Sequence, residues 1–358
     1  MRIGLIAPPW TPVPPVGYGG TEVVVDNLAR GLQSLGHEVR LFSVGESACP
    51  VPTSYLYETA PRPIGTTVEE AAHVLAAYDA MADVDVIHDH TVLGPLLAPQ
   101  RQRGMPPVLS THHGAFTGEN RRIFRQTARR AAVIAISHDQ ASRAPEIPVA
   151  AVIHHGIDLA TYRAGPGDGG YLLFLGRMSP EKGAATALRV ARRSGHRLVL
   201  ATKMREAAEI DYFKTVVEPL LTDDDQVLVE PSLGVRLELL RHAQALVNPI
   251  AWPEPFGLAM AEALASGTPV VGHGTGAAPE IVDHGVTGFL CRDEDELADA
   301  AGRIATLDRA ACRAAAEERF SLPRMVRDHV ELYERVLANP ASTRELHLGD
   351  PLPDAVVA

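Results

Sequence analysis

Residues 171–183 have the sequence YLLFLGRMSPEKG, and the fold class of the chain can be read from this stretch. Its first five residues, Tyr171–Leu175, are all apolar and run directly into a loop that contains Gly176. A short apolar run without alternation is typical of a strand buried on both faces of a parallel sheet. Ser179 and Pro180 then predict the start of the helix that such a strand needs in order to reach its parallel neighbour.

The same alternation of apolar runs and helical segments extends over most of the chain. Thr21–Leu35, for example, has apolar residues at helical spacing and is followed by Gly36, which predicts a helix. Strands and helices in alternation indicate an α/β fold with parallel sheets covered on both faces. The predicted strands are Arg2–Ala7, Glu38–Ser43, Asp85–His88, Pro107–Thr111, Val133–Ile136, Ala150–His154, Tyr171–Leu175, Leu198–Thr202, Gln226–Glu230, Ala245–Pro249, Pro269–Gly272 and Gly288–Cys291.

A glycine-rich segment, Ala164–Gly170, divides these strands into two groups. It can hold neither a helix nor a central strand, so it is predicted to be a linker. We therefore expect two Rossmann-like, doubly wound domains that face each other across a cleft at the carboxyl ends of both sheets. The expected bounds are 1–164 for the first domain, 165–322 for the second, 323–340 for a final helix and 341–358 for a poorly ordered tail.

The composition excludes several classes of protein. A formal charge of −11 over 358 residues argues against general nucleic-acid binding, which depends on excess Lys and Arg. Cys49, Cys291 and Cys312 are scattered and odd in number, which predicts a reducing compartment without a disulfide framework. Met1–Ala7 is too short for a signal peptide, and no stretch of about 18 apolar residues occurs. The predicted location is cytoplasmic.

Two cations lie at the end of the strand quoted first. Arg177 follows Gly176, and Lys182 lies in the predicted first turn of the next helix. A helix N-terminus already carries partial positive charge, so a lysine there is disfavoured unless it meets an anion. Together with free backbone N–H groups, the two cations predict a site for a diphosphate. An ordinary surface loop with two incidental charges is the alternative.

Two glutamates frame the start of another helix, in the segment Trp252–Ala263. Glu262 lies in a run that is otherwise Leu, Ala and Met, which predicts a buried helix. A carboxylate in such a place requires hydrogen-bond donors, and no Lys or Arg occurs between residues 242 and 291. Its partner is therefore a distant residue or a ligand with hydroxyl groups, unless the side chain simply reaches solvent. Glu254 lies just ahead of the helix.

Glycines and histidines follow several predicted strands of the first group. Gly17–Glu22 is a loop in which Gly20 would let the backbone approach a ligand, although the GxGxxG pattern is incomplete. Paired histidines at three strand ends suggest a metal site, but neighbouring residues of a strand point to opposite faces. His113, followed by Gly114, is the best candidate for a cleft residue. The pairs are His88 with His90, His112 with His113, and His154 with His155.

A basic run occupies residues 121–130, where Arg122, Arg125 and Arg129 would share one face of a helix. This face could contact an anionic acceptor or, weakly, a membrane surface. A solvated helix face is the simpler interpretation.

Taken in order, four motifs resemble the retaining glycosyltransferases of family 4, which have the GT-B fold of two Rossmann-like domains. The resemblance covers about residues 1–340, and its most specific part is the Glu-x7-Glu pair. The motifs are Gly-Gly-Thr-Glu at 19–22, Thr-His-His-Gly at 111–114, Gly-Arg-x4-Lys-Gly at 176–183 and Pro-Glu-Pro-Phe-Gly at 253–257.

The resemblance implies a role for each charged residue. Arg177 and Lys182 would neutralise the donor diphosphate, and Glu262 would bind the ribose hydroxyls. Glu254 would contact the transferred sugar and help to stabilise positive charge at its anomeric carbon. His113 would hydrogen-bond the donor sugar. The first domain would then be the acceptor side, and the final helix would pack back towards it.

The resemblance also implies roles for backbone groups. The N–H groups of Phe256, Gly257 and Leu258 would meet the sugar or phosphate, Gly20 would let its loop approach the donor, and Lys203 would lie near the base. Two segments depart from the family pattern, namely 155–158 and 273–276, where His155 and His273 precede a glycine. Because both lie near the expected cleft, the donor sugar cannot be transferred from the family.

The expected reaction is transfer of a hexosyl group from a nucleoside diphosphate sugar, UDP- or GDP-linked, to a hydroxyl of a glycan, lipid or small molecule. Retention of anomeric configuration is expected, and neither a metal nor another cofactor. The enzymatic alternatives are an epimerase or a phosphorylase of the same architecture, and a metal hydrolase built on the histidines. A sugar-nucleotide-binding protein without catalytic activity is the alternative from another class.

Overall fold

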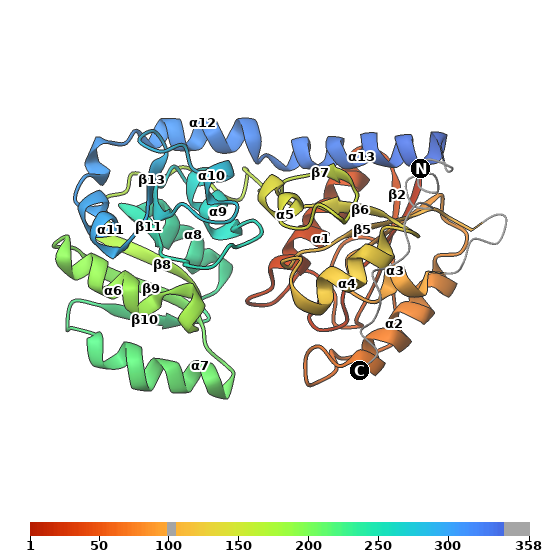
Figure 1. The fold of residues 1–358 in the computed structure, drawn as a ribbon, viewed down its shortest axis with the longest axis horizontal. Coiled ribbons are helices and arrows are strands. Elements are labelled where there is room, and N and C mark those ends of the chain that lie inside the picture. The colour runs from red at the N-terminus through yellow and green to blue at the C-terminus, as the bar shows by residue number, and fades with distance from the viewer. Residues whose placement is uncertain (99–104, 340–358) are drawn as a thin grey trace, which may run out of the picture.

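The structure, a computed structural model, describes residues 1–98 and 105–339. Two parallel sheets lie side by side and form two halves of the molecule (Figure 1). Their strand orders are β3-β2-β1-β4-β5-β6-β7 and β10-β9-β8-β11-β12-β13, so each order reverses next to the first strand of its half. The strands are β1 Arg2–Ile6, β2 Glu38–Ser43, β3 Thr53–Tyr55, β4 Val86–Asp89, β5 Val108–Thr111, β6 Ala132–Ala135, β7 Val149–Val152, β8 Tyr171–Arg177, β9 Arg197–Lys203, β10 Gln226–Val229, β11 Ala245–Asn248, β12 Val270–His273 and β13 Gly288–Cys291.

Helices cover both faces of each sheet, as a doubly wound fold requires. In the first half these are α1 Gly20–Ser34, α2 Thr67–Ala80, α3 Gly94–Leu97, α4 Gly118–Thr127 and α5 His138–Ser142. In the second half they are α6 Ala184–Arg193, α7 Ala207–Tyr212, α8 Leu233–His242, α9 Leu258–Ala265, α10 Ala278–Ile281, α11 Glu294–Ala301 and α12 Arg309–Arg319, and the last helix is α13 Leu322–Ala338.

Two local predictions are wrong. The edge strand β3 was missed, because Thr53–Tyr55 is short, polar and largely exposed and so lacks the apolar run of a buried strand. The helix predicted to begin at Ser179 begins at Ala184 instead. Pro180–Lys182 forms one 3-10 turn, and Gly183 then adopts the left-handed conformation with φ 79° that separates this turn from α6. Lys182 therefore lies in a connecting turn and not in the first turn of the helix.

The last two helices lie end to end across both halves (Figure 1). The first of them, α12, packs on α9 in the second half, whereas α13 packs on α1 in the first half. The contact with α1 is close, because a Cβ atom at Gly31 would lie 2.3 Å from Cγ2 of Val326. Tyr333, also on α13, is fully buried and hydrogen-bonds Nδ1 of His88 at 2.7 Å. The C-terminal helix is thus part of the first hydrophobic core.

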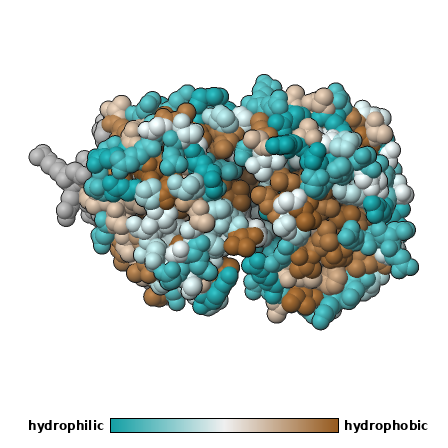
Figure 2. Space-filling view, turned by 180° about the vertical axis from the view of Figure 1, so that it is seen from behind, coloured by the Kyte–Doolittle hydropathy of each residue, from teal (hydrophilic) through white to brown (hydrophobic). Residues whose placement is uncertain are grey.

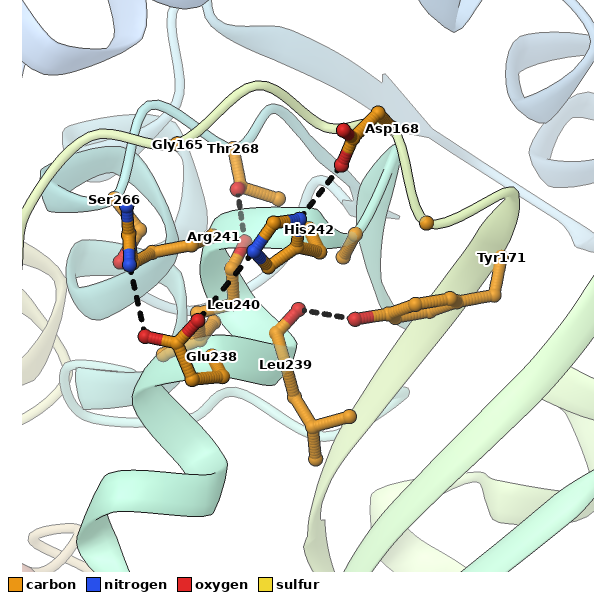
Figure 3. Close-up of polar contacts among 12 residues, drawn as sticks. Gly165, Asp168, Tyr171, Glu238, Leu239, Leu240, Arg241, His242, Ser266 and Thr268 are labelled. Carbon is orange, nitrogen blue, oxygen red and sulfur yellow. Dashed lines mark hydrogen bonds and ion pairs between the residues drawn. The ribbon is translucent and has the colours of Figure 1, made fainter.

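The linker between the sheets is fastened to the second half. The N–H groups of Gly165, Gly167 and Gly169 donate to backbone carbonyls of Ser266, Arg241 and His242. Figure 3 shows Asp168 of the linker reaching the ring of His242 at the end of α8, where the two are 2.6 Å apart.

Arg309 of α12 closes the same arrangement. It donates to the carbonyl oxygens of Gly165 and Ala243, both at 2.9 Å, and to Oγ1 of Thr268 at 2.8 Å. The linker therefore belongs to the second half structurally, and a joint between the halves fits better near Ile157, where it pairs with Ser321. The predicted bounds of the domains stay a proposal, and the predicted tail 341–358 lies outside the described residues.

The surface is mixed in polarity. Figure 2 shows apolar side chains gathered mainly on the half built on the second sheet. The exposed apolar residues of that half include Val229, at the end of edge strand β10, and Leu233 and Val235 on α8. In the part of the chain that the structure describes, no helix is both long and apolar enough to span a membrane.

Candidate active site

A cleft with a volume of about 350 Å³ opens between the two halves. Residues that follow strands of both sheets line it, so it lies at their carboxyl ends, as predicted. All the predicted site residues except Lys203 line this cleft. They are Gly20, His113, Arg177, Lys182, Glu254, Phe256, Gly257, Leu258 and Glu262.

Lys182 and Glu254 form an ion pair inside the cleft. Nζ of Lys182 contacts Oε1 of Glu254, and the two side chains are only 13% and 18% exposed. The same ammonium lies 5.9 Å from the centre of the Trp252 ring, within cation–π range. The sequence predicted that both residues lie at a ligand site, but it did not predict their contact with each other. Any anion that binds Lys182 therefore has Glu254 as a neighbour and competitor.

The backbone around Lys182 is held by a close approach to β11. A Cβ atom at Gly183 would lie 2.6 Å from the carbonyl oxygen of Pro249, so only glycine fits there. This contact turns the side chain of Lys182 towards the cleft. The second cation, Arg177, is half exposed and pairs with Glu181 at 2.8 Å. Exposed pairs of this kind are weak, so Arg177 remains accessible to a ligand.

Glu254 is fixed through its backbone by the loop after β12. Its carbonyl oxygen accepts a hydrogen bond from Ala277 N–H at 3.0 Å. A Cβ atom at Gly276 would lie 2.5 Å from both the nitrogen and the oxygen of Glu254, so the two segments are in tight contact. The segment 273–276, which departs from the family pattern, thus positions a cleft residue directly.

The N-terminus of α9 faces the cleft. Gly257 has φ 101°, and a Cβ atom there would lie 2.4 Å from Cε of Met260. The first N–H groups of a helix have no partner within the helix, so those of Gly257 and Leu258 point a partial positive charge towards the cleft. Phe256 is buried and its ring meets that of His155 edge to face, with the centroids 4.9 Å apart. This arrangement suits an anion or a hydroxyl oxygen.

Glu262 has a protein partner in addition to any ligand. The hydroxyl of Tyr162 donates to its Oε1 at 2.7 Å, over a sequence separation of 100 residues. Burial raises the pKa of Glu262, while Tyr162 and the nearby Arg236 act in the opposite direction. The expectation of a distant residue or a ligand is therefore met by a distant residue, and the carboxylate also lines the cleft.

Histidines that follow β4, β5 and β7 form a connected group in the first half. Nε2 of His113 lies 2.9 Å from Nδ1 of His90, and the rings of His113 and His155 stack with their centroids 5.1 Å apart. Burial lowers the pKa of His113 to about 3, so the ring is neutral near pH 7. Among residues 1–98 and 105–339, no group of three or more His, Cys, Asp or Glu side chains is arranged to hold a metal ion.

The glycine loop of the first half touches the second half. A Cβ atom at Gly20 would lie 3.2 Å from Cδ1 of Leu258, so the loop lies against the start of α9. Gly17 approaches Arg205 similarly, at 3.1 Å from its guanidinium. The predicted close approach of this loop to the cleft is thus observed, whereas its contact with a ligand stays a prediction.

Lys203 lines an adjoining hollow and not the main cleft. Its ammonium is bound by Glu209 at 2.8 Å and by Glu206 at 3.5 Å. Arg236 of α8 lines both the hollow and the cleft, and its Nε is buried without a partner among the described residues. Sequence reasoning missed Arg236, because an arginine on a short helix that also carries Arg241 gives no signal before its neighbours in space are known.

Glu280 on α10 joins the two halves beside the cleft. It accepts hydrogen bonds from the N–H groups of His138 and Asp139 at the start of α5, at 2.9 and 2.7 Å. It also lies 2.7 Å from Nε2 of His154. Burial opposes its ionisation, but these donors together lower the pKa of Glu280. This contact, which the sequence did not reveal, holds the halves together where α10 meets α5.

A second cavity, of about 440 Å³, lies next to the cleft on the side of the first half. It shares Trp252 and Pro255 with the cleft, and residues 115–118 form part of its wall. Arg121 also lines it and is paired with Glu146. The prediction that Arg129 shares a helix face with Arg122 is wrong, because α4 ends at Thr127. A membrane contact for this run stays a hypothesis.

Comparison with known proteins identifies the family. Residues 18–161 match the domain described as Glycosyltransferase Family 4, and residues 169–306 match Glycosyl transferases group 1. The solved structure of AviGT4, a glycosyltransferase involved in avilamycin A biosynthesis, is 30% identical, with a TM-score of 0.70. The match covers 94% of this chain and 98% of AviGT4. This chain belongs to glycosyltransferase family 4. The predicted family, GT-B fold and glycosyltransferase activity are confirmed.

Two further proteins resemble this glycosyltransferase, one in part of its sequence and the other in its fold. A GDP-mannose:cellobiosyl-diphosphopolyprenol alpha-mannosyltransferase of Xanthomonas oryzae is 30% identical over 213 residues, which cover 53% of this chain. The match spans just over half of that relative, namely 56%. Anabaena HepE, solved in complex with UDP-glucose, has a TM-score of 0.75 at 20% identity, covering 94% of this chain and 100% of HepE. That likeness shows the fold alone.

Proposed function

We propose that this glycosyltransferase moves a hexosyl group from a nucleoside diphosphate sugar to an acceptor hydroxyl, with retention of anomeric configuration. The observation that carries the proposal is the set of groups that line one cleft. The cations Arg177 and Lys182, the N-terminus of α9 and the buried carboxylate of Glu262 all line it. Together these groups complement a diphosphate and the sugar and ribose that flank it.

In this proposal the diphosphate binds to Arg177, Lys182 and the N–H groups at the start of α9. These groups stabilise the negative charge that develops on the leaving phosphate. Glu262, already oriented by Tyr162, accepts hydrogen bonds from the two ribose hydroxyls. Because fixed cations neutralise the diphosphate, we further propose that turnover needs no divalent metal ion.

Glu254 would act nearest the bond that breaks. Its carboxylate lies in the cleft beside Lys182, where it can stabilise positive charge at the anomeric carbon. For retention, the leaving phosphate takes the proton of the acceptor hydroxyl on the same face of the sugar, so no separate base is required. His113 hydrogen-bonds the transferred sugar, and Lys203 lies nearer the base, in the hollow next to Arg236.

The acceptor would enter through the second cavity, which shares Trp252 and Pro255 with the donor cleft. Residues 115–118 of the first half, which the resemblance makes the acceptor side, form part of its wall. Names of relatives support the two substrate classes: HepE was solved with UDP-glucose, and the Xanthomonas relative is named for GDP-mannose and a diphosphopolyprenol acceptor. The donor here is therefore expected to be a UDP- or GDP-hexose.

A thermal-shift panel of UDP, GDP, ADP and dTDP tests the donor class. One of them should raise the melting temperature, and EDTA should not abolish the effect. With the matching hexose donor, release of nucleoside diphosphate should fall at least about 100-fold in Lys182→Ala. Proton NMR of the product should show the anomeric configuration of the donor. Stabilisation by none of the four nucleotides, or full turnover in Lys182→Ala, would contradict the proposal.

A further inference from the structure

His90 lies directly behind the cleft residue His113. His90 follows β4 and is 4% exposed, whereas His113 lines the cleft. The two rings meet through one hydrogen bond, of 2.9 Å, between Nδ1 of His90 and Nε2 of His113. Among the described residues, Nδ1 of His113 has no hydrogen-bond partner, so this ring nitrogen remains for a ligand. The direction of this single bond determines whether Nδ1 of His113 is a hydrogen-bond donor or an acceptor for a ligand in the cleft.

The environment of His90 fixes that direction. Its other nitrogen, Nε2, is buried and has no hydrogen-bond partner among the described residues. Leaving a buried N–H without an acceptor is costlier and rarer than leaving an acceptor lone pair unused. The favoured tautomer of His90 therefore carries its proton on Nδ1 and leaves Nε2 bare. Nδ1–H of His90 then donates to Nε2 of His113.

We propose that His90 is a positioning residue that holds His113 in the tautomer with its proton on Nδ1, so that His113 presents an N–H donor to the cleft. The ligand group opposite must then be an oxygen acceptor, which we assign to a hydroxyl of the transferred sugar. This assignment rests on the function proposed above. His113 stays neutral near pH 7 and so supplies a hydrogen bond, not a proton.

The support for His90 extends to the C-terminal helix. Its ring lies against that of His88, with the centroids 4.1 Å apart. His88 is held at both nitrogens, by the hydroxyls of Tyr333 and Thr111, each at 2.7 Å. Because Tyr333 belongs to α13, the packing of that helix on the first half helps to fix a group in the cleft.

Three variants separate positioning from simple packing. His90→Phe keeps an aromatic ring against His88 but removes the donor nitrogen. His90→Asn places an amide N–H near the position of Nδ1 and should restore the bond. His112→Phe is the matched control, because His112 is also buried but packs on Phe124 and makes only a long contact, 3.3 Å, with a backbone carbonyl.

The first measurement needs no ligand. In protein labelled with ¹⁵N-histidine, with the His113 signals assigned through His113→Phe, wild type should show a protonated Nδ1 and a bare Nε2. His90→Phe should lose this fixed tautomer, whereas His90→Asn and His112→Phe should keep it. A wild-type His113 protonated on Nε2 would overturn the inference, whatever the donor proves to be.

The second measurement compares binding of UDP with turnover of UDP-glucose, or GDP with GDP-mannose where guanine nucleotides bind. In His90→Phe, kcat/KM for the sugar donor should fall about tenfold, as for one lost hydrogen bond, with the Kd of the bare nucleotide within about twofold. His90→Asn should recover most of the loss. Equal losses in both quantities, or no rescue, would show a structural role only. Failure of every nucleotide to bind wild type contradicts the proposed function instead.

Discussion

Replacing Glu254 by glutamine should separate donor binding from catalysis. In the structure, Lys182 is paired with Glu254 in a site where both side chains are mostly buried. A diphosphate that binds Lys182 must share that cation and also approach the carboxylate. Glu254→Gln keeps the size of the side chain but removes its charge. The nucleoside diphosphate should therefore bind more tightly, while turnover falls.

The size of the effect follows from the charges involved. Two unit charges about 4 Å apart interact by about 4 kcal/mol at an effective dielectric constant of 20. Lys182 has three N–H donors and can hold both partners partly, so we expect about a third of that energy, about 1.4 kcal/mol, to be recovered. The Kd of the nucleoside diphosphate should then fall about tenfold. Loss of a charge that stabilises the transition state should lower kcat at least about 100-fold.

Isothermal titration calorimetry with the nucleotide chosen by the thermal-shift panel measures the first quantity, and product release measures the second. Glu181→Gln is the matched control, because it removes the partner of Arg177 from an exposed pair. Exposed pairs contribute little, so its Kd should change less than about twofold. Weaker nucleotide binding by Glu254→Gln, or unchanged kcat, would refute the reasoning.

Three further variants test the supports of the site. Tyr162→Phe removes a hydrogen bond to Glu262 and should destabilise the protein by about 1–3 kcal/mol. Burial raises the pKa of Glu262 and the Tyr162 hydroxyl opposes this, so the bond matters most when the acid is ionised. Denaturant unfolding should therefore show a larger loss of stability at pH 8 than at pH 5. Glu280→Gln should lower the melting temperature near pH 7, and the difference should vanish as the pH falls through the lowered folded-state pKa, because that stability exists only while the carboxylate is ionised. Arg309→Lys keeps the charge but loses the planar guanidinium that binds the linker. The free energy of unfolding, measured in denaturant, should fall by about 2 kcal/mol or more. A fall below about 0.5 kcal/mol would show that Arg309 does not fasten the linker.

The architecture could be predicted because strands buried in a parallel sheet consist of continuous apolar residues. Tyr171–Leu175 is such a run, and its repetition along the chain predicted two doubly wound parallel sheets, although not the order of their strands. The local predictions failed where the apolar or polar character of the residues does not decide the secondary structure. The start of α6 depends on the left-handed backbone of Gly183, and β3 is an edge strand whose polar residues resemble a loop.

The sequence predicted which residues line the site but not which of them contact each other. Cleft residues such as Lys182 and Glu254 could be named because their charges follow predicted strands or begin helices. The pairing of Lys182 with Glu254 and that of Glu262 with Tyr162 join segments far apart in sequence. Both therefore depend on how loops and a turn pack around α9, which the sequence pattern does not show. Glu280 was invisible for the same reason, since its three donors all come from the other half.

The fastening of the linker by Arg309 has a practical meaning for hybrid enzymes. An exchange of donor-binding halves between relatives would be cut most safely near Ile157 and Phe320, where Ile157 N–H donates to the Phe320 carbonyl at 2.7 Å. A cut at the glycine-rich segment would instead separate Gly165 from the arginine that holds it. The last helix, α13, would have to come from the same parent as α1, because it completes that parent's core.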